Sequence, residues 1–379
     1  MDGFQVVAAS MPMDIPRRME VIHAFREQGG SIAAVLPIYY PRELLRAFNL
    51  LPVEVWGPPG LNANQGKVHL QPYVCSIVQN ALTFLQSGGL DGVEAILVPH
   101  ACDSLQGLGS ILIDFIPVFG KHGFTKHRQP VLTLYLPRGK RASDIDFLAN
   151  ELRSIYHRLA EITSRSPTDI EIMACIHREE TADGWLACLH HLRRNLPLTD
   201  TSLYRLIRSR EYLPAEKFSK LAESVLAQVS GENRGGIPIL LSGIVPEPMS
   251  LFETITELGG RVVADDLACC GRRLYSTGSN QDPFQRMAER IVNTPPDPMR
   301  GSPIQLRLDY LIQLAQENGA QGVVFYEIKF CEPELFDLPL LRHGLRQVGL
   351  PSIVLEVDLN DRYSQPVINR LAAFLEMLQ

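Results

Sequence analysis

Features that would place a protein at a membrane are scarce in this sequence of 379 residues. The longest apolar stretch, Leu108–Phe119, is too short to cross a bilayer and contains Asp114. The first ten residues lack a basic segment followed by an apolar one, which a signal peptide needs. We therefore expect a cytoplasmic protein with no membrane partner.

Positive charge and phosphate-binding motifs are scarce as well. The net charge is −6, and no basic run is interleaved with aromatic residues, whereas nucleic-acid binding needs a positive surface. No GxGxxG motif is present, and residues 60–67 (GLNANQGK) have five residues between their glycines, followed by Val68 where a phosphate loop needs Ser or Thr. We expect no nucleic-acid partner and no ATP site of this type.

The composition is that of a globular chain with room for more than one core. Hydrophobic residues make up 45% and charged residues 21% of the sequence, which is ordinary for globular proteins. A single core rarely serves 379 residues, so we expect two domains.

The first half alternates between short apolar runs and helical patterns, which predicts βαβ units and a parallel sheet. A helix is predicted over Ser143–Leu159 with Ser143 as its cap and Phe147 on its apolar face, followed by a largely helical stretch to about residue 229. The predicted strands are Ser31–Ile38, Leu51–Trp56, Glu94–Val98 and Val131–Leu136.

The alternation resumes after the polar, glycine-rich residues 230–236, which we interpret as a domain boundary. Here Ser302 is predicted to cap a helix that begins with Pro303. The predicted strands are Ile237–Leu241, Arg261–Ala264, Gly322–Tyr326 and Ser352–Val357.

The fold class that follows is α/β, with two doubly wound parallel-sheet domains of the Rossmann or flavodoxin type. Residues 1–229 would form the first domain with a helical extension, and residues 237–379 the second. Ligands of such sheets bind beyond the carboxyl ends of the strands, so a cleft between the two domains is the expected site.

Three of the seven cysteines stand at predicted helix N-termini: Cys75, Cys102 and Cys331. An odd number of cysteines in a reducing compartment argues against a disulfide framework. Helix N-termini favour thiolates, which hold iron–sulfur clusters. No two of the three are two to four residues apart, as structural zinc ligands usually are. Their spacing alone leaves a cluster, a zinc site and ordinary loop cysteines open.

A resemblance narrows this choice. The segments 73–81 (YVCSIVQNA), 98–105 (VPHACDSL), 262–273 (VVADDLACCGRR), 329–338 (KFCEPELFDL) and 365–378 (QPVINRLAAFLEML) are similar to motifs of the 2-hydroxyacyl-CoA dehydratase and benzoyl-CoA reductase family, and occur in the same order. The resemblance extends from about residue 15 to the end of the chain.

The resemblance implies an iron–sulfur enzyme subunit with one [4Fe–4S] cluster held by Cys75, Cys102 and Cys331. A separate ATP-hydrolysing iron–sulfur activator would supply one low-potential electron. An acyl-CoA would be the substrate, and a related second subunit or a second copy of the chain would complete the enzyme.

The resemblance leaves several reactions open. Dehydration of a 2-hydroxyacyl-CoA is the first expectation, and dearomatising reduction of benzoyl-CoA is the alternative. Two others are a homodimeric double-cubane-type reductase and a subunit that only relays electrons.

The remaining candidates each have a functional and a structural interpretation. Cys269 and Cys270 would be accessory ligands or residues that line the cleft. His100, two residues before Cys102, would carry protons or simply be a hydrogen-bonded loop residue. Lys329, Arg272 and Arg273 would bind CoA phosphates, balance cluster charge or lie in solvent.

A zinc site among Cys175, His177, Cys188, His190 and His191 is not expected. His177 and Cys188 are eleven residues apart, which is about 16 Å along a helix at 1.5 Å per residue.

Overall fold

The structure is a computed structural model that describes residues 14–36, 38–55, 61, 64–89, 92–119, 129–229, 235–360 and 364–379. Residues 230–234, within the predicted domain boundary, lie outside the described residues, as do residues 60, 62 and 63 of the segment compared with a phosphate loop. Among the described helices none is long and apolar enough to cross a bilayer.

The first half builds a four-stranded parallel sheet with the strand order β2-β1-β3-β4. Its elements are α1 (Arg18–Glu27), β1 (Ser31–Val35), α2 (Arg42–Ala47), β2 (Leu50–Glu54), α3 (Asn64–Lys67), α4 (Ser76–Gln86), β3 (Ala95–His100), α5 (Asp103–Phe119) and β4 (Val131–Tyr135).

A helical segment follows, as predicted. It consists of α6 (Ala142–Thr163), α7 (Asp169–Leu192), the 3₁₀ turn η1 (Arg193–Asn195), α8 (Asp200–Ser209) and α9 (Ala215–Leu226).

The second half repeats the architecture of the first. Its sheet has the order β6-β5-β7-β8, again all parallel. The elements are β5 (Ile237–Gly243), α10 (Ser250–Glu257), β6 (Gly260–Leu267), η2 (Gly271–Arg273), α11 (Pro283–Val292), η3 (Pro298–Arg300), α12 (Ile304–Asn318), β7 (Gly322–Ile328), α13 (Glu332–Gln347), β8 (Ser352–Val357) and α14 (Gln365–Met377).

The predicted α/β class with two doubly wound sheets is confirmed. In both sheets the strand order reverses between the first and third strands, β1 and β3 in one and β5 and β7 in the other. Such switch points are where ligands of open α/β sheets bind. The loops that follow β3 and β7 lie at these points, and they carry Cys102 and Cys331.

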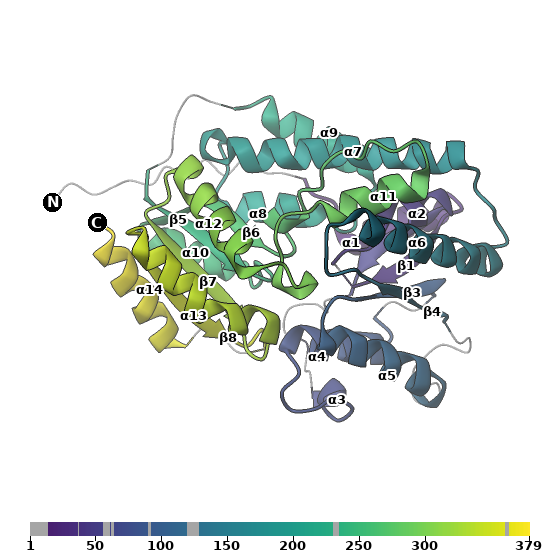
Figure 1. Cartoon of the computed structure of the whole chain (residues 1–379), viewed down its shortest axis with the longest axis horizontal. Helices are drawn as coiled ribbons and strands as arrows, with labels where there is room; N and C mark the ends of the chain where they lie inside the picture. Colours follow the sequence, from purple (N-terminus) through teal and green to yellow (C-terminus); the bar gives the residue numbers. More distant parts are fainter. Residues whose placement is uncertain are drawn as a thin grey trace.

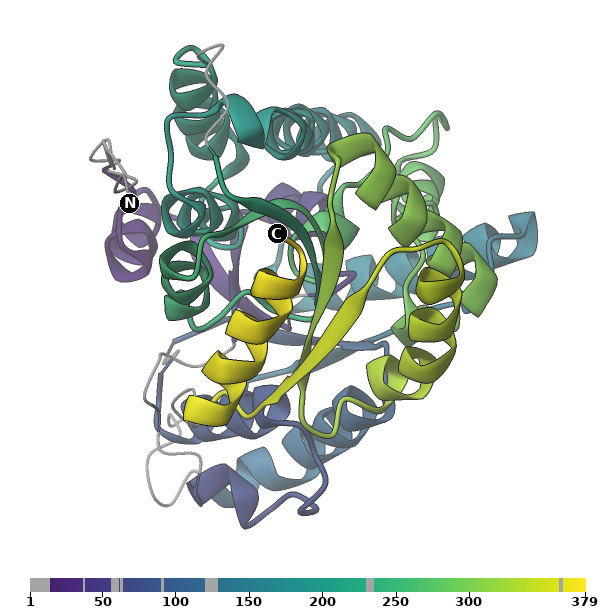
Figure 2. The same ribbon diagram turned by 90° about the vertical axis from the view of Figure 1, so that its left-hand side faces the viewer.

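The two halves are packed against each other rather than separated by a linker. Figure 1 shows the two sheets with their helices, and α7 and α9 along one side of the molecule; Figure 2 shows α14 and α13 on opposite faces of the second sheet. Helix α11, from the second half of the chain, packs against α6 and α7. The domain limits of 229 and 237 remain a prediction.

Two predicted helix caps are wrong by one or two residues. The N-cap of α6 is Arg141 rather than Ser143, because Asp144 turns back to accept a 2.8 Å hydrogen bond from the Arg141 amide. Helix α12 begins at Ile304 after Pro303, and Ser302 instead accepts a hydrogen bond from the Asp297 amide.

One residue of the predicted apolar face of α6 was also misassigned. Phe147 is 45% exposed, whereas its neighbour Leu148 is fully buried.

Gly243 is the last residue of β5, at the sheet edge from which the loop that carries Cys331 also leaves β7. Its φ of 150° is rarely adopted by other residues, and an added Cβ would lie 2.1 Å from the carbonyl oxygen of Tyr326 on β7. The close approach of β5 and β7 at the switch point thus depends on a glycine.

We expect Gly243→Ala to lower the free energy of unfolding by about 1–3 kcal/mol, because the strand pair must separate or strain. Urea unfolding followed by circular dichroism measures it. Gly184→Ala is the matched control: it lies exposed within α7 with open space around its Cα, and should stabilise by about 0.5–1 kcal/mol. Equal effects of the two substitutions would contradict the prediction.

Candidate functional site

Cys75, Cys102 and Cys331 all stand at the start of a helix, as predicted. Cys75 is the N-cap of α4, Cys331 is the N-cap of α13, and Cys102 directly precedes α5. Strands β3 and β7 run to His100 and Ile328, so Cys102 and Cys331 follow their strands even more closely than the sequence suggested.

Backbone amides of the first helical turns point at two of the sulfur atoms. The thiol of Cys75 accepts hydrogen bonds from the amides of Ile77 and Val78, and that of Cys102 from the amides of Ser104 and Leu105. Amide groups at a helix N-terminus carry partial positive charge and stabilise an anion placed there.

The fold brings the three thiols together from both halves of the chain. A negative charge on Cys75 raises the pKa of Cys102, and charges on Cys75 and Cys102 both raise the pKa of Cys331. The start of α4 is also tied to the second half, because Ser76 accepts a 3.2 Å hydrogen bond from the Leu359 amide beyond β8. Cys75, Cys102 and Cys331 are hereafter called the thiol triad.

Burial is the dominant influence on the thiol triad. It raises the pKa of Cys102 to about 12, and also raises the pKa of Cys75 and, well above the usual value, that of Cys331. Burial therefore outweighs the helix amides, which by themselves lower the pKa of Cys75 and Cys102 as expected. Three buried, mutually repelling thiolates form only if a bound cation compensates them, as a thiolate-binding metal centre does.

Among the described residues no group of three or more His, Cys, Asp or Glu side chains is placed to hold a single metal ion. The cysteine ligands of a [4Fe–4S] cube bind different iron atoms and so stand farther apart than the ligands of one ion. Thiols from three separate loops fit such a cube in kind and in number.

A pocket of about 490 Å³ opens beside the thiol triad. Three of its lining residues, Val74, Asp103 and Glu332, are chain neighbours of the three cysteines. In the part of the chain that the structure describes, neither Lys nor Arg lines it. The lining residues are His69, Leu70, Gln71, Tyr73, Val74, Asp103, Ser104, Gly107, Ile111 and Glu332.

His100 lies at the end of β3 with its ring edge-on to Tyr135 of β4, at a centroid distance of 4.6 Å. Both ring nitrogens are buried and have no hydrogen-bond partner among the described residues. Burial lowers its pKa, which favours the neutral ring. A proton-carrying role for His100 stays a prediction.

Cys269 and Cys270 are buried in the loop after β6. The charged groups that shift the pKa of these two thiols include Arg208, Glu247 and Asp265. In the thiol triad, by contrast, each cysteine interacts electrostatically with another member of the triad. Their role as accessory ligands stays a prediction.

All seven cysteines are free thiols, in line with the argument against disulfides. His177 and Cys188 lie on the single helix α7, which is the geometry assumed in the argument against a zinc site there.

Arg272 and Arg273 are not available to phosphate or solvent, contrary to two of the three roles considered for them. Both are buried in the turn after β6. Arg273 donates to Glu54 at the end of β2 (2.9 Å) and to Glu211 after α8. Arg208 donates to the other oxygen of Glu54 at 3.0 Å. A guanidinium from the second half is thus enclosed by carboxylates of the first.

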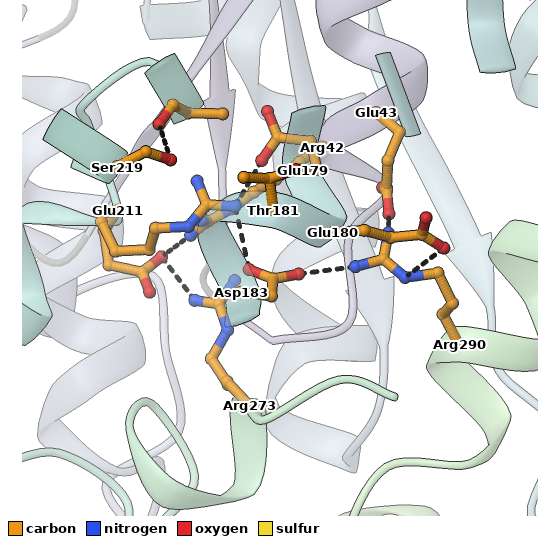
Figure 3. A network of polar contacts seen from close by, with 12 residues as sticks. Arg42, Glu43, Glu179, Glu180, Thr181, Asp183, Glu211, Ser219, Arg273 and Arg290 are labelled. Carbon is orange, nitrogen blue, oxygen red and sulfur yellow. Dashed lines mark hydrogen bonds and ion pairs between the residues drawn. The ribbon is translucent and has the colours of Figure 1, made fainter. Parts of the chain in front are cut away.

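A second buried ion-pair group joins α11 to the first half. Arg290 pairs with Glu43 of α2 and, at 2.6 Å, with Asp183 of α7 (Figure 3). Figure 3 also shows Arg42 and Arg273 facing Glu211 from opposite sides. Sequence reasoning missed both groups, because a lone Arg or Glu on a helix resembles surface charge until a distant segment covers it.

Known proteins resemble this chain over most of its length. Residues 37–378 match the family model described as 2-hydroxyglutaryl-CoA dehydratase, D-component.

Among curated proteins the chain is 24% identical to the (R)-phenyllactyl-CoA dehydratase beta subunit of Clostridium sporogenes, over 96% of both chains. It is 24% identical to one of the benzoyl-CoA reductase subunits of Thauera aromatica, over 92% of this chain and 91% of that one. It is also 24% identical to the (R)-2-hydroxyglutaryl-CoA dehydratase beta subunit of Acidaminococcus fermentans, over 100% and 98%.

We expect Arg273→Met to lower the free energy of unfolding by about 3–5 kcal/mol, because Glu54 and Glu211 lose a buried counter-ion. Arg153→Met, which removes an ion pair to Asp282 with both side chains partly exposed, should cost roughly 0–1 kcal/mol. Urea unfolding of the two variants tests the contrast. Similar losses in both would show that the buried pairs contribute no more than surface ones.

Proposed function

Because the chain belongs to the 2-hydroxyglutaryl-CoA dehydratase D-component family, we propose that this enzyme subunit binds one [4Fe–4S] cluster through Cys75, Cys102 and Cys331. Its proposed activity is low-potential radical chemistry on an acyl-CoA, with dehydration of a 2-hydroxyacyl-CoA as the first reaction. The observation that carries the proposal is that three thiols, buried at Cys75 and Cys331 and partly buried at Cys102, stand at three helix N-termini beside one pocket.

When bound, the cluster would supply single electrons at low potential. The chain's own contribution is to hold and surround it. Amides of Ile77, Val78, Ser104 and Leu105 direct partial positive charge at two ligand sulfurs. Burial of Cys75 and Cys331 reduces contact with water at those two ligands and strengthens the electrostatic interactions there.

The pocket beside the triad is suited to the reacting end of a thioester rather than to the CoA phosphates. Leu70, Val74 and Ile111 give it apolar walls, while Asp103 and Glu332 are the acidic groups of its lining. Phosphate binding favours Lys, Arg or helix amides, and the described lining has neither Lys nor Arg. The phosphates would therefore be held by other parts of the enzyme.

Two protein partners belong to this proposal. Relatives named as beta subunits support a related second subunit, although a second copy of the chain would serve the same purpose. The electron would come from a separate ATP-hydrolysing iron–sulfur activator, which is in keeping with the missing phosphate-loop sequence.

We expect anaerobically purified protein to contain about four iron and about four sulfide per chain, and Cys102→Ser to lose most of both. Cys175→Ser is the matched control, because Cys175 is a buried cysteine that lies within α7, away from the thiol triad. Iron and acid-labile sulfide analysis gives the answer. Contents of about eight of each would support a double cluster, and stoichiometric zinc would exclude the mechanism.

Ring reduction is the second candidate reaction, favoured by the similarity to a benzoyl-CoA reductase subunit. The complex, co-purified with its partner and supplied with activator and ATP, would be given lactoyl-, phenyllactyl-, 2-hydroxyglutaryl- and benzoyl-CoA. We expect loss of water from a 2-hydroxyacyl-CoA, detected by mass spectrometry of the thioester. Two hydrogens gained by benzoyl-CoA alone would assign the second reaction instead.

A further inference from the structure

Glu327 is an acidic residue inside the second sheet without a visible counterpart. It lies on β7, four residues before Cys331, and its side chain is fully buried. Neither carboxyl oxygen has a hydrogen-bond partner among the described residues. A buried polar group in this state is costly, so its presence calls for a physical account.

Four charged side chains surround Glu327 and satisfy one another. Arg272 donates to both oxygens of Asp266, at 2.8 and 3.0 Å, and also to Glu334. Arg307 of α12 donates to the other oxygen of Glu334. All four are fully buried. We call Asp266, Arg272, Arg307 and Glu334 the ion-pair cluster.

The charges of the ion-pair cluster already sum to zero, with two guanidinium groups facing two carboxylates. Nearby acids only add negative charge: Asp297 lies 3.7 Å from Arg272, and Asp337 lies 3.2 Å from Arg307. A carboxylate at Glu327 would therefore have no counter-ion left among the described residues. Burial and the charge of Glu334 raise the pKa of Glu327 well above its usual value. For Glu334 itself, burial is outweighed by Arg272 and Arg307, which hold its pKa below the usual value.

Glu327 also acts on the thiol triad. An ionised Glu327 would, like Glu334, oppose ionisation of the Cys331 thiol. Among the described residues, the titratable and charged groups around Glu327 are Asp266 of β6, Arg272 of η2, Arg307 of α12, Glu334 and Asp337 of α13, Cys331, and Glu356 beside it on β8. Both cations of that set already have carboxylate partners.

We propose that Glu327 is a neutral carboxylic acid at neutral pH, and that its bound proton keeps uncompensated negative charge away from Cys331. Glu327 is thus a positioning residue that acts through charge. It allows Cys331 to ionise when a metal centre binds, without a second buried anion behind it.

The first test is infrared spectroscopy of the metal-free chain at pH 7. The carbonyl stretching band of a protonated carboxyl group should be present and should disappear in Glu327→Gln. Glu356→Gln is the matched control, because Glu356 pairs in register with Glu327 on β8 but is exposed. A band unchanged by Glu327→Gln would overturn the proposal.

The second test is the pH dependence of stability. Glu327 keeps its proton in the folded chain above the unfolded pKa of about 4.3, so the folded form binds one more proton than the unfolded form. The equilibrium ratio of folded to unfolded wild-type chain, divided by the same ratio for Glu327→Gln, should fall about tenfold for each pH unit above the unfolded pKa of Glu327. A ratio independent of pH would contradict the proposal, even where the variant is less stable throughout.

The third test uses the loaded protein and rests on the proposed cluster, which the first two do not need. Glu327→Gln replaces one neutral group with another, so the midpoint potential at pH 7 should be unchanged in an electron-paramagnetic-resonance redox titration. A shift to a more positive potential would mean that wild-type Glu327 is ionised, and would overturn the proposal. Normal iron content in both proteins keeps this result separate from a failure of cluster binding.

Discussion

Within each sheet the strands run parallel, and this constraint sends every strand-to-helix loop of that sheet out from the same edge. The helices that follow then point their N-termini at that edge. Cys75, Cys102 and Cys331 occupy three such helix starts. A site between two parallel sheets therefore receives ligands and partial positive charges from the same backbone geometry, without needing any pair of ligands close in sequence.

Two sheets form one site only if their edges keep a fixed position relative to each other. Buried ion pairs between the two halves fix that position. Arg273 reaches from the second half to Glu54 at the end of β2, and Arg290 reaches α2 and α7. Such pairs gain little net stability over apolar packing, but leaving one partner alone is costly. They therefore penalise any displacement of one half against the other, and so fix the position of Cys331 relative to Cys75.

The sequence was most informative where local physics decides the outcome. Strand positions and the helix starts at the three cysteines followed from apolar periodicity and helix-end signals. Helix caps were less certain, because Asp144 competes with Ser143 for the same turn. The burial of Arg273 was not predictable, because its partners Glu54 and Glu211 are distant in the sequence. The same holds for Arg272, whose partner Glu334 lies 62 residues further along the chain. Only the residue-by-residue resemblance assigned the three cysteines to one cluster.

The same charge pattern bears on electron transfer. Arg272 and Arg273 follow the cysteine pair in the chain, yet internal carboxylates already neutralise both. Among the residues that the structure describes, the groups directed at the thiol triad include the partial charges of helix amides and, at the pocket wall, Asp103 and Glu332. Adding an electron to a centre that faces acidic groups is unfavourable. A cluster held there would have a low potential, as one-electron reduction of a thioester requires, and a neutral Glu327 would limit how far the potential falls.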